Sequence, residues 1–243
     1  MKLFVCSDVH GNVRALDAVL ARYREEQPCD FLFLGDCVGY GPHPAGCLQR
    51  IAGLPRAHLL LGNHDAALLD ARAREDMNPR ALEALGWSSR EIGERERAIL
   101  RERFTMQWNE EGIIAAHASP VEPERWTYVF SAVGAMEIFH ALDFHVCFTG
   151  HTHLPMLATF DGGEVEFPAD VQIPVDDRDR HVVNPGSVGQ PRDGDPRAAC
   201  LVYDTEAASI TLSRIPYDID AAIGDFRGTP IPAFYAERLR EGK

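Results

Sequence analysis

Five short apolar runs, each followed within a few residues by aspartate, asparagine or histidine, constrain the fold of this chain more than any other feature. The runs span residues 2–7, 31–34, 58–61, 113–116 and 144–149. Each is as short and as continuously apolar as a buried strand, and residues 13–23 place apolar side chains at helical spacing after the first run. Strands that alternate with helices predict a layered α/β fold in which helices cover a central sheet.

The polar residues that follow these runs are metal-ligand types. They are Asp8 and His10, Asp36, Asn63 with His64, His117, and His151 with His153. Ligands gather at the carboxyl ends of strands in open α/β sheets, so we expect these residues to converge on one site. Imidazole and carboxylate suit Mn, Fe or Zn, and a set without cysteine argues against a closed structural zinc site. Seven of these eight residues as ligands are already too many for one tetrahedral ion and fit two ions that share one carboxylate.

The remaining segments complete a single domain over residues 1–243. Residues 66–111 are rich in Ala, Arg, Glu and Leu and predict a helical insertion beside the sheet end. Two β segments flank Asp161-Gly162-Gly163, which predicts a hairpin turn. Residues 169–180 are acidic and predict a loop, and residues 216–243 predict a helical tail.

Composition limits the compartment and the partners. The chain has 24 Lys and Arg against 37 Asp and Glu, a net charge of −13. This charge repels phosphate backbones, so a nucleic-acid polymer is an unfavourable partner. The start of the chain is too short in apolar residues for a signal peptide, and no run reaches the length of a spanning helix. Six cysteines without a CxxC pair predict buried free thiols, and together these features predict a cytoplasmic protein.

Two divalent ions reverse the local charge, because two carboxylates with two such ions carry a net charge of about +2. An acidic protein can therefore hold a small phosphorylated substrate at this centre.

The order of the motifs resembles calcineurin-like metallophosphoesterases, over nearly the whole chain. The matching segments are Asp8-Val9-His10-Gly11-Asn12, Gly35-Asp36, Gly62-Asn63-His64-Asp65, His117 and Gly150-His151-Thr152-His153. Three further segments resemble a compact bacterial subgroup of this family: Asp36 to Pro42, Asn184 to Arg192 and Glu237-Arg238-Leu239. The resemblance implies a four-layer αββα sandwich and two divalent ions, with Mn favoured over Fe or Zn.

The resemblance also implies roles for individual residues. Asp8, His10 and His153 would hold one ion, and Asp36 would bridge it to a second ion. Asn63, His117 and His151 would complete the ligands of that second ion. A hydroxide between the ions would attack phosphorus. His64 would contact the phosphoryl group and protonate the leaving oxygen, with Asp65 orienting it. The chain departs from the family at Ala118, where glycine usually follows the histidine.

Four further residues have alternative interpretations. Asn12 either caps the following helix or reaches a phosphoryl oxygen. Arg192 either pairs with a neighbouring aspartate or contacts substrate. Tyr40 and His43 either line the substrate entrance or pack within their loop.

The resemblance predicts a phosphoesterase that acts on phosphomonoesters or phosphodiesters of small or nucleotide-like molecules. The alternatives are a non-catalytic metal-binding scaffold of the same fold, or a protein phosphatase or nuclease with the same centre. Scaffolds of this fold tend to lose metal ligands or the histidine at position 64, and this chain keeps both. The ester preference and the oligomeric state stay open.

Overall fold

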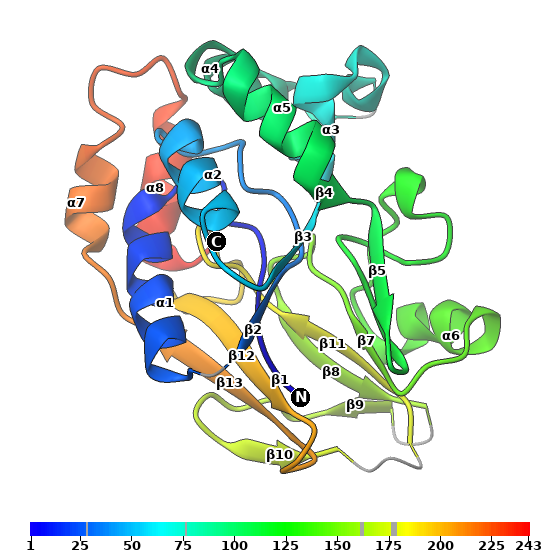
Figure 1. Cartoon of the computed structure of the whole chain (residues 1–243). Coiled ribbons are helices and arrows are strands. Elements are labelled where there is room, and N and C mark those ends of the chain that lie inside the picture. Colours follow the sequence, from blue (N-terminus) through cyan, green and yellow to red (C-terminus); the bar gives the residue numbers. More distant parts are fainter. Residues whose placement is uncertain (28, 76, 161–162, 176–178) are drawn as a thin grey trace.

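Two β-sheets lie face to face, with helices on both outer faces (Figure 1). This computed structural model describes residues 1–27, 29–75, 77–160, 163–175 and 179–243. The predicted four-layer αββα sandwich is confirmed.

The first sheet has the strand order β10-β13-β12-β1-β2-β3-β4. Its strands are β1 (Lys2–Cys6), β2 (Asp30–Phe33), β3 (Ala57–Leu60), β4 (Phe104–Thr105), β10 (Gln172–Pro174), β12 (Ala198–Asp204) and β13 (Ser209–Ile215). Strands β1 to β4 are parallel, whereas β12 pairs antiparallel to β1. The carboxyl ends of β1, β2 and β3 therefore meet at one edge of the sheet.

The second sheet has the strand order β5-β6-β7-β11-β8-β9. Its strands are β5 (Gln107–Glu110), β6 (Ile113–Ala116), β7 (Val146–Phe148), β8 (Pro155–Thr159), β9 (Gly163–Val165) and β11 (His181–Pro185). Strands β6, β7 and β11 are parallel, so His117 and the segment 150–153 leave this sheet at a common edge.

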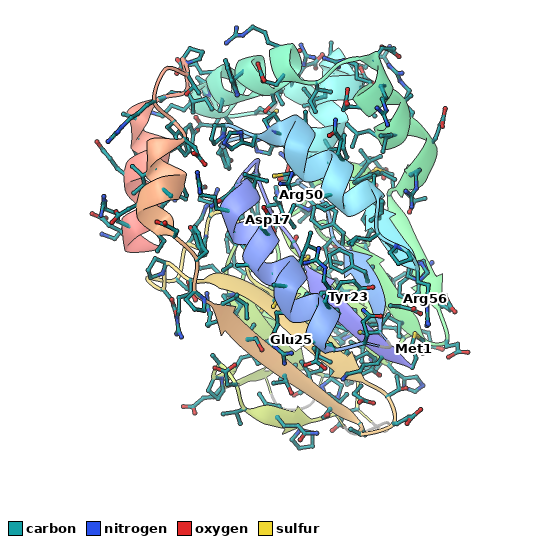
Figure 2. All side chains as sticks on the ribbon, turned by 60° about the vertical axis from the view of Figure 1, so that its left-hand side comes forward. Met1, Asp17, Tyr23, Glu25, Arg50 and Arg56 are labelled. Atoms are coloured by element: carbon teal, nitrogen blue, oxygen red, sulfur yellow. The ribbon has the colours of Figure 1, made fainter. Side chains whose placement is uncertain are left out.

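The helices divide unequally between the two outer faces. They are α1 (Val13–Glu25), α2 (Pro44–Ala52), α3 (Asn63–Leu69), α4 (Pro79–Glu91), α5 (Glu94–Arg103), α6 (Ala132–Ala141), α7 (Ile219–Gly224) and α8 (Ala233–Glu241), with the short 3₁₀ helices η1 (Ala71–Arg74) and η2 (Pro123–Arg125). Helix α6 lies against the second sheet, and the other α-helices lie on the side of the first (Figure 1). Asp17 of α1 accepts from the guanidinium of Arg50 of α2, with Nε at 2.7 Å, and joins these neighbouring helices (Figure 2).

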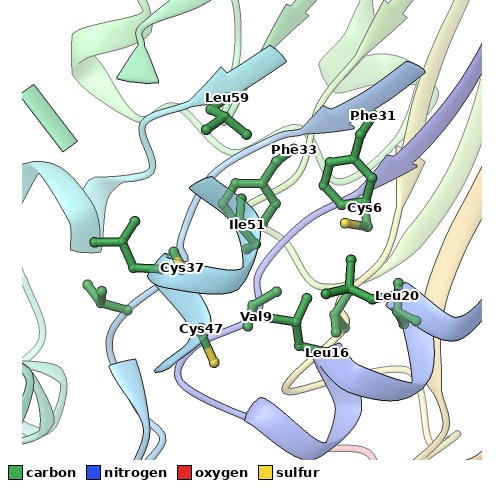
Figure 3. Close-up of a cluster of buried hydrophobic side chains, with 14 of the residues drawn as sticks. Cys6, Val9, Leu16, Leu20, Phe31, Phe33, Cys37, Cys47, Ile51 and Leu59 are labelled. Atoms are coloured by element: carbon green, nitrogen blue, oxygen red, sulfur yellow. The ribbon is translucent and has the colours of Figure 1, made fainter. Parts of the chain in front are cut away.

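Alternation along the strands builds two cores from one sheet. Phe31 and Phe33 of β2 face the helices, together with Leu16 of α1 and Ile51 of α2 (Figure 3). Leu32 between them faces the second sheet, because successive side chains of a strand point to opposite faces. The first sheet is thus apolar on both sides, which explains the continuous hydrophobicity of its runs.

The segment expected to be a helical insertion, residues 66–111, is helical only as far as Arg103. Residues 104–105 and 107–110 are strands β4 and β5, which extend one sheet and begin the other. Strand β5 is polar because it is an edge strand with two exposed residues, so its composition resembles that of a helix surface. Glu111 and Gly112, both with positive φ, make the turn into β6.

Two other expectations fall partly outside the described residues. The predicted hairpin turn at 161–162 is among the positions not described, although β8 and β9 on either side pair antiparallel. Residues 176–178 of the predicted loop are also not described, and residues 172–174 of that loop form β10, which pairs with β13. In the described ranges no helix combines the length and the hydrophobicity needed to span a membrane.

Candidate metal centre

The loops that follow β1 and β2 run side by side and are joined by backbone hydrogen bonds. Asp8 N–H donates to the Gly35 carbonyl, and His10 N–H donates to the Asp36 carbonyl, both at 2.9 Å. Five candidate ligands have left-handed backbone: Asp8 (φ 56°), His10 (47°), Asp36 (58°), His151 (66°) and His153 (63°). Such a conformation costs roughly 1–2 kcal/mol per L-residue. Five of the eleven non-glycine residues with positive φ in the described part of the chain are therefore candidate ligands.

Asp8, His10 and His153 form the first candidate ligand set, with ligand atoms within 4.8 Å of one another. His153 Nε2 lies 3.3 Å from Asp8 Oδ1 and 3.1 Å from His10 Nε2. All three side chains are buried, and Asp8 Oδ1 has no hydrogen-bond partner in the described part of the chain. The other carboxylate oxygen accepts from the backbone N–H of His151, which fixes the orientation of the group.

Asp36, His117 and His151 form the second candidate ligand set. His117 Nε2 lies 3.1 Å from His151 Nδ1 and 3.4 Å from Asp36 Oδ2. The same carboxylate oxygen lies 3.5 Å from His10 Nε2 of the first set. Asp36 Oδ2 therefore lies between the two sets.

Three imidazoles turn Nδ1 away from the centre and Nε2 toward it. Three rings place Nδ1 beside a backbone carbonyl: His10 at 2.9 Å from Val38, His117 at 2.9 Å from Leu34 and His153 at 2.6 Å from Gln190. A carbonyl oxygen only accepts, so Nδ1 carries the proton of the neutral ring and Nε2 keeps a lone pair. These lone pairs face one another and two carboxylates. The donor set therefore fits divalent cations with imidazole and carboxylate preferences.

The electrostatics of the centre keep most of the rings neutral and the carboxylates charged. Burial lowers the pKa of His10 and His153, and it lowers the pKa of His151 to about 3. Burial opposes ionisation of Asp36, but the imidazoles of His117 and His64 outweigh it and hold the pKa of Asp36 well below its usual range. Neutral imidazole and ionised carboxylate are the forms that bind metal.

His117 differs from the other rings. Burial disfavours its charged form, yet the carboxylates of Asp36 and Asp8 outweigh burial and raise the pKa of His117 to about 9. This ring holds a proton that a metal ion would replace.

Asn63 and His64 begin helix α3 at the same edge. Asn63 Oδ1 is buried and lacks a hydrogen-bond partner in the described residues, which suits a ligand atom. His64 shares a third set of this kind with His10 and Asp36. Its Nε2 lies 3.1 Å from the Tyr40 hydroxyl, and burial lowers the pKa of His64 to about 4.

The predicted role of Asp65 in orienting His64 is wrong. The Asp65 carboxylate accepts from four backbone N–H groups, those of residues 36, 37, 38 and 62, at 2.8–3.2 Å. Its oxygens face the loop that holds Asp36, and the ring of His64 is paired with Tyr40 instead. Asp65 positions the Asp36 loop.

The structure supports the capping alternative for Asn12. Its Oδ1 accepts from Ala15 N–H, and its Nδ2 donates to the Gly189 carbonyl and to the Tyr217 hydroxyl. The amide is engaged within the protein, as the helix-cap alternative expects. Arg192, in contrast, lies beside the centre, and its backbone N–H donates to the His153 carbonyl at 3.3 Å.

Several contacts around the centre lie beyond what the motifs indicate. Tyr128 stacks on His151 with ring centroids 3.9 Å apart, although it is 47% exposed. Tyr40 contacts His10 and His64, whereas His43 pairs with Asp225. In the sequence, Tyr128 is marked only as one of several aromatic residues that follow η2. Nothing in the neighbouring sequence indicates that these residues lie beside the metal centre.

Comparisons with known proteins agree with this geometry. The model of the calcineurin-like phosphoesterase superfamily domain matches residues 1–208. Uncharacterized protein MJ0912 of Methanocaldococcus jannaschii is 31% identical over 242 residues, covering 98% of this chain and 97% of that protein. A metallophosphoesterase from Sphaerobacter thermophilus has a TM-score of 0.88 and 32% identity, with 100% of both chains covered. Hypothetical protein PH1004 from Pyrococcus horikoshii shares the fold, with a TM-score of 0.80 and 18% identity over 100% of this chain and 98% of its own.

Proposed function

The chain belongs to the calcineurin-like phosphoesterase superfamily, and from this membership we propose that it is a metal-dependent hydrolase of small or nucleotide-like phosphoesters. The observation that carries the proposal is the position of Asp36 Oδ2, within 3.5 Å of imidazole nitrogens from both ligand sets. One carboxylate between two sets is the arrangement that two ions require for a shared ligand.

The proposed ligands divide as the two sets do. Asp8, His10 and His153 would hold one divalent ion, and His117, His151 and Asn63 would hold the other, with Asp36 shared. Such ions supply an activated water and neutralise phosphoryl charge. We propose manganese as the first metal to test, because the oxygen and imidazole donors suit it.

His64 is the proposed residue for proton transfer to the leaving oxygen. Its Nε2 is paired with the hydroxyl of Tyr40, which lines a cavity beside the centre. A phosphoryl dianion bound next to this ring would raise the lowered pKa of His64 toward neutrality, since an opposite charge stabilises the protonated form. Tyr40 would position His64, whereas Asp65 would position the loop that holds Asp36.

Two observations weigh against the alternatives. A scaffold without catalysis has no need of the seven proposed ligands together with a buried His64, and this chain has all eight. A net charge of −13 disfavours a nuclease that acts on long nucleic acid.

All six cysteines are buried free thiols, which supports the proposed cytoplasmic location.

Parallel hydrolysis of p-nitrophenyl phosphate and bis-p-nitrophenyl phosphate tests the proposal. Each ester is assayed with the purified protein, after chelation and after reloading with Mn²⁺. Turnover that chelation abolishes and Mn²⁺ restores is the expected result, and the preferred ester separates monoesterase from diesterase. Bound metal without turnover of either ester would favour the scaffold.

A further inference from the structure

A cavity of about 280 Å³ beside the candidate metal centre is lined by three arginines and several aromatic rings. We name it the guanidinium cavity and define it by Arg80, Arg192, Arg238, Tyr40, Phe234 and Tyr235. It brings together helix α4, helix α8 and the loops after β2 and β11, segments that are far apart in the sequence. The C-terminal helix thus supplies three of the six residues.

The arginines of the guanidinium cavity have no aspartate or glutamate partner in the described part of the chain, although Arg238 Nε donates to the main-chain oxygen of Lys243. Among the described residues none of the three lies within 4.0 Å of an aspartate or glutamate oxygen, whereas Arg240 on the same helix as Arg238 lies 2.7 Å from Asp220. Arg192 donates to the Gln190 side chain, and its buried Nε has no partner in the described part of the chain. Positive charge is therefore gathered where no aspartate or glutamate of the described residues pairs with it.

The guanidinium cavity adjoins the proposed reaction site. The guanidinium of Arg192 lies 5.8 Å from the centroid of the Tyr40 ring, and the hydroxyl of Tyr40 lies 3.1 Å from His64 Nε2. Arg80 and Arg238 lie 4.9 and 5.2 Å from the centroid of the Phe234 ring. Tyr40 stacks on Tyr235 at 4.6 Å and connects the two groups. The three guanidinium groups therefore lie between the metal centre and helix α8.

Resting on the proposed function, we propose that the guanidinium cavity binds a second phosphate of the substrate, so that organic diphosphates and longer oligophosphates are the preferred substrate class. Guanidinium groups bind phosphate oxygens in a bidentate, charge-assisted manner. A phosphoester with an uncharged leaving group would leave these arginines without a partner. The aromatic walls accept a flat group attached to that phosphate.

The test compares two adenosine substrates with one and two phosphates. In each, water oxygen bonds to the terminal phosphorus, and the P–O bond to the leaving group breaks: adenosine leaves from the monophosphate ester, and the monophosphate leaves from the diphosphate anhydride. Phosphate release from adenosine 5′-monophosphate and adenosine 5′-diphosphate is measured with the metal-loaded protein, alongside p-nitrophenyl phosphate. We expect kcat/KM for the diphosphate to exceed that for the monophosphate by at least tenfold. Arg238→Gln should lower this ratio about tenfold to hundredfold, the range of one charge-assisted hydrogen bond.

Arg240→Gln is the matched control, because it removes the same charge from the same helix outside the guanidinium cavity. Its ratio should equal that of the wild type. Binding of the non-hydrolysable α,β-methylene analogue of adenosine 5′-diphosphate, measured by calorimetry, gives a readout independent of turnover. Arg238→Gln should weaken the affinity for this analogue by a similar factor. Thermal melting establishes that both variants fold, and Arg80→Gln provides a second variant from α4.

The outcomes separate this inference from the function on which it rests. If p-nitrophenyl phosphate is hydrolysed but the diphosphate-to-monophosphate ratio of kcat/KM is the same in Arg238→Gln and Arg240→Gln, the second-phosphate site is refuted. The proposed phosphoesterase function would still hold in that case. Absence of turnover on every ester would overturn the proposed function, and the substrate class with it.

Discussion

Replacing Gly39 by alanine should disable the metal centre, because Gly39 lies where two of its imidazoles meet. A Cβ at this position would come within 2.7 Å of both His10 Nδ1 and His64 Nδ1. The backbone has little freedom to retreat, since the hydroxyl of Ser88 on α4 accepts from Gly39 N–H and donates to its carbonyl. The imidazoles themselves must therefore move.

The structure sets the size of the effect. Ordinary contact for a Cβ begins at 3.4 Å, so against 2.7 Å each ring must shift by about 0.7 Å. Displacement of a ligand ring from its supporting carbonyl weakens metal binding about 10- to 100-fold. Gly39 also has φ +126°, which a residue with a side chain adopts at a cost of about 1–3 kcal/mol. For a chain of this length, each kcal/mol lost from the free energy of unfolding lowers the melting temperature by about 2–4 °C. The melting temperature of Gly39→Ala should therefore fall by about 2–12 °C.

The assay combines metal titration against a fluorescent chelator with thermal melting of the metal-free protein. Gly86→Ala is the matched control, because the same methyl group is added in the interior of α4, where no atom beyond the neighbouring residues and the backbone of that helix lies within 4 Å of the added carbon. It should leave metal affinity unchanged and stabilise the protein by about 0.5–1 kcal/mol, the ordinary gain of alanine over glycine in a helix. A Gly39→Ala protein with wild-type affinity and an unchanged melting temperature would refute the reasoning.

Three further predictions concern the centre directly. Asp36→Asn should lose both metals and turnover, measured by elemental analysis and hydrolysis, whereas Asp17→Asn on the surface of α1 should keep both; two bound metals with full activity in Asp36→Asn would exclude a shared ligand. His64→Ala should retain its metal while turnover falls about 10²–10⁴-fold, and normal turnover would remove His64 from the mechanism. Chelation should lower the melting temperature, and free Mn²⁺ at 100 times its dissociation constant should restore about 2.7 kcal/mol, whereas a melting temperature independent of Mn²⁺ would contradict a folded-state site.

The sequence was sufficient for the layered fold and for the convergence of the proposed ligands. Both depend on local features, since apolar runs with polar residues at their ends define parallel strands and the edge where those strands finish. The family resemblance drawn from the order of these motifs is confirmed by the match over residues 1–208.

Other features depend on packing that local sequence does not encode. Strand β5 is polar like a helix surface, and only its pairing with β6 defines it as a strand. Asp65 is adjacent to His64 in sequence, but as part of α3 its carboxylate turns to the backbone of residues 36–38. Arg238 belongs to the C-terminal tail, and the stacking of Tyr235 on Tyr40 brings that tail beside the centre.

The left-handed backbone at five candidate ligands has a consequence for laboratory evolution. With roughly 1–2 kcal/mol of strain at each, the five together are comparable with the 5–15 kcal/mol by which a typical domain is stable. A library screened for heat resistance alone should accumulate glycine and asparagine at His10, His151 and His153, because these residues tolerate the left-handed backbone and relieve its strain. Survivors of that screen would be more stable than the parent and unable to bind metal, so selection for durability must be paired with selection for metal binding at every round.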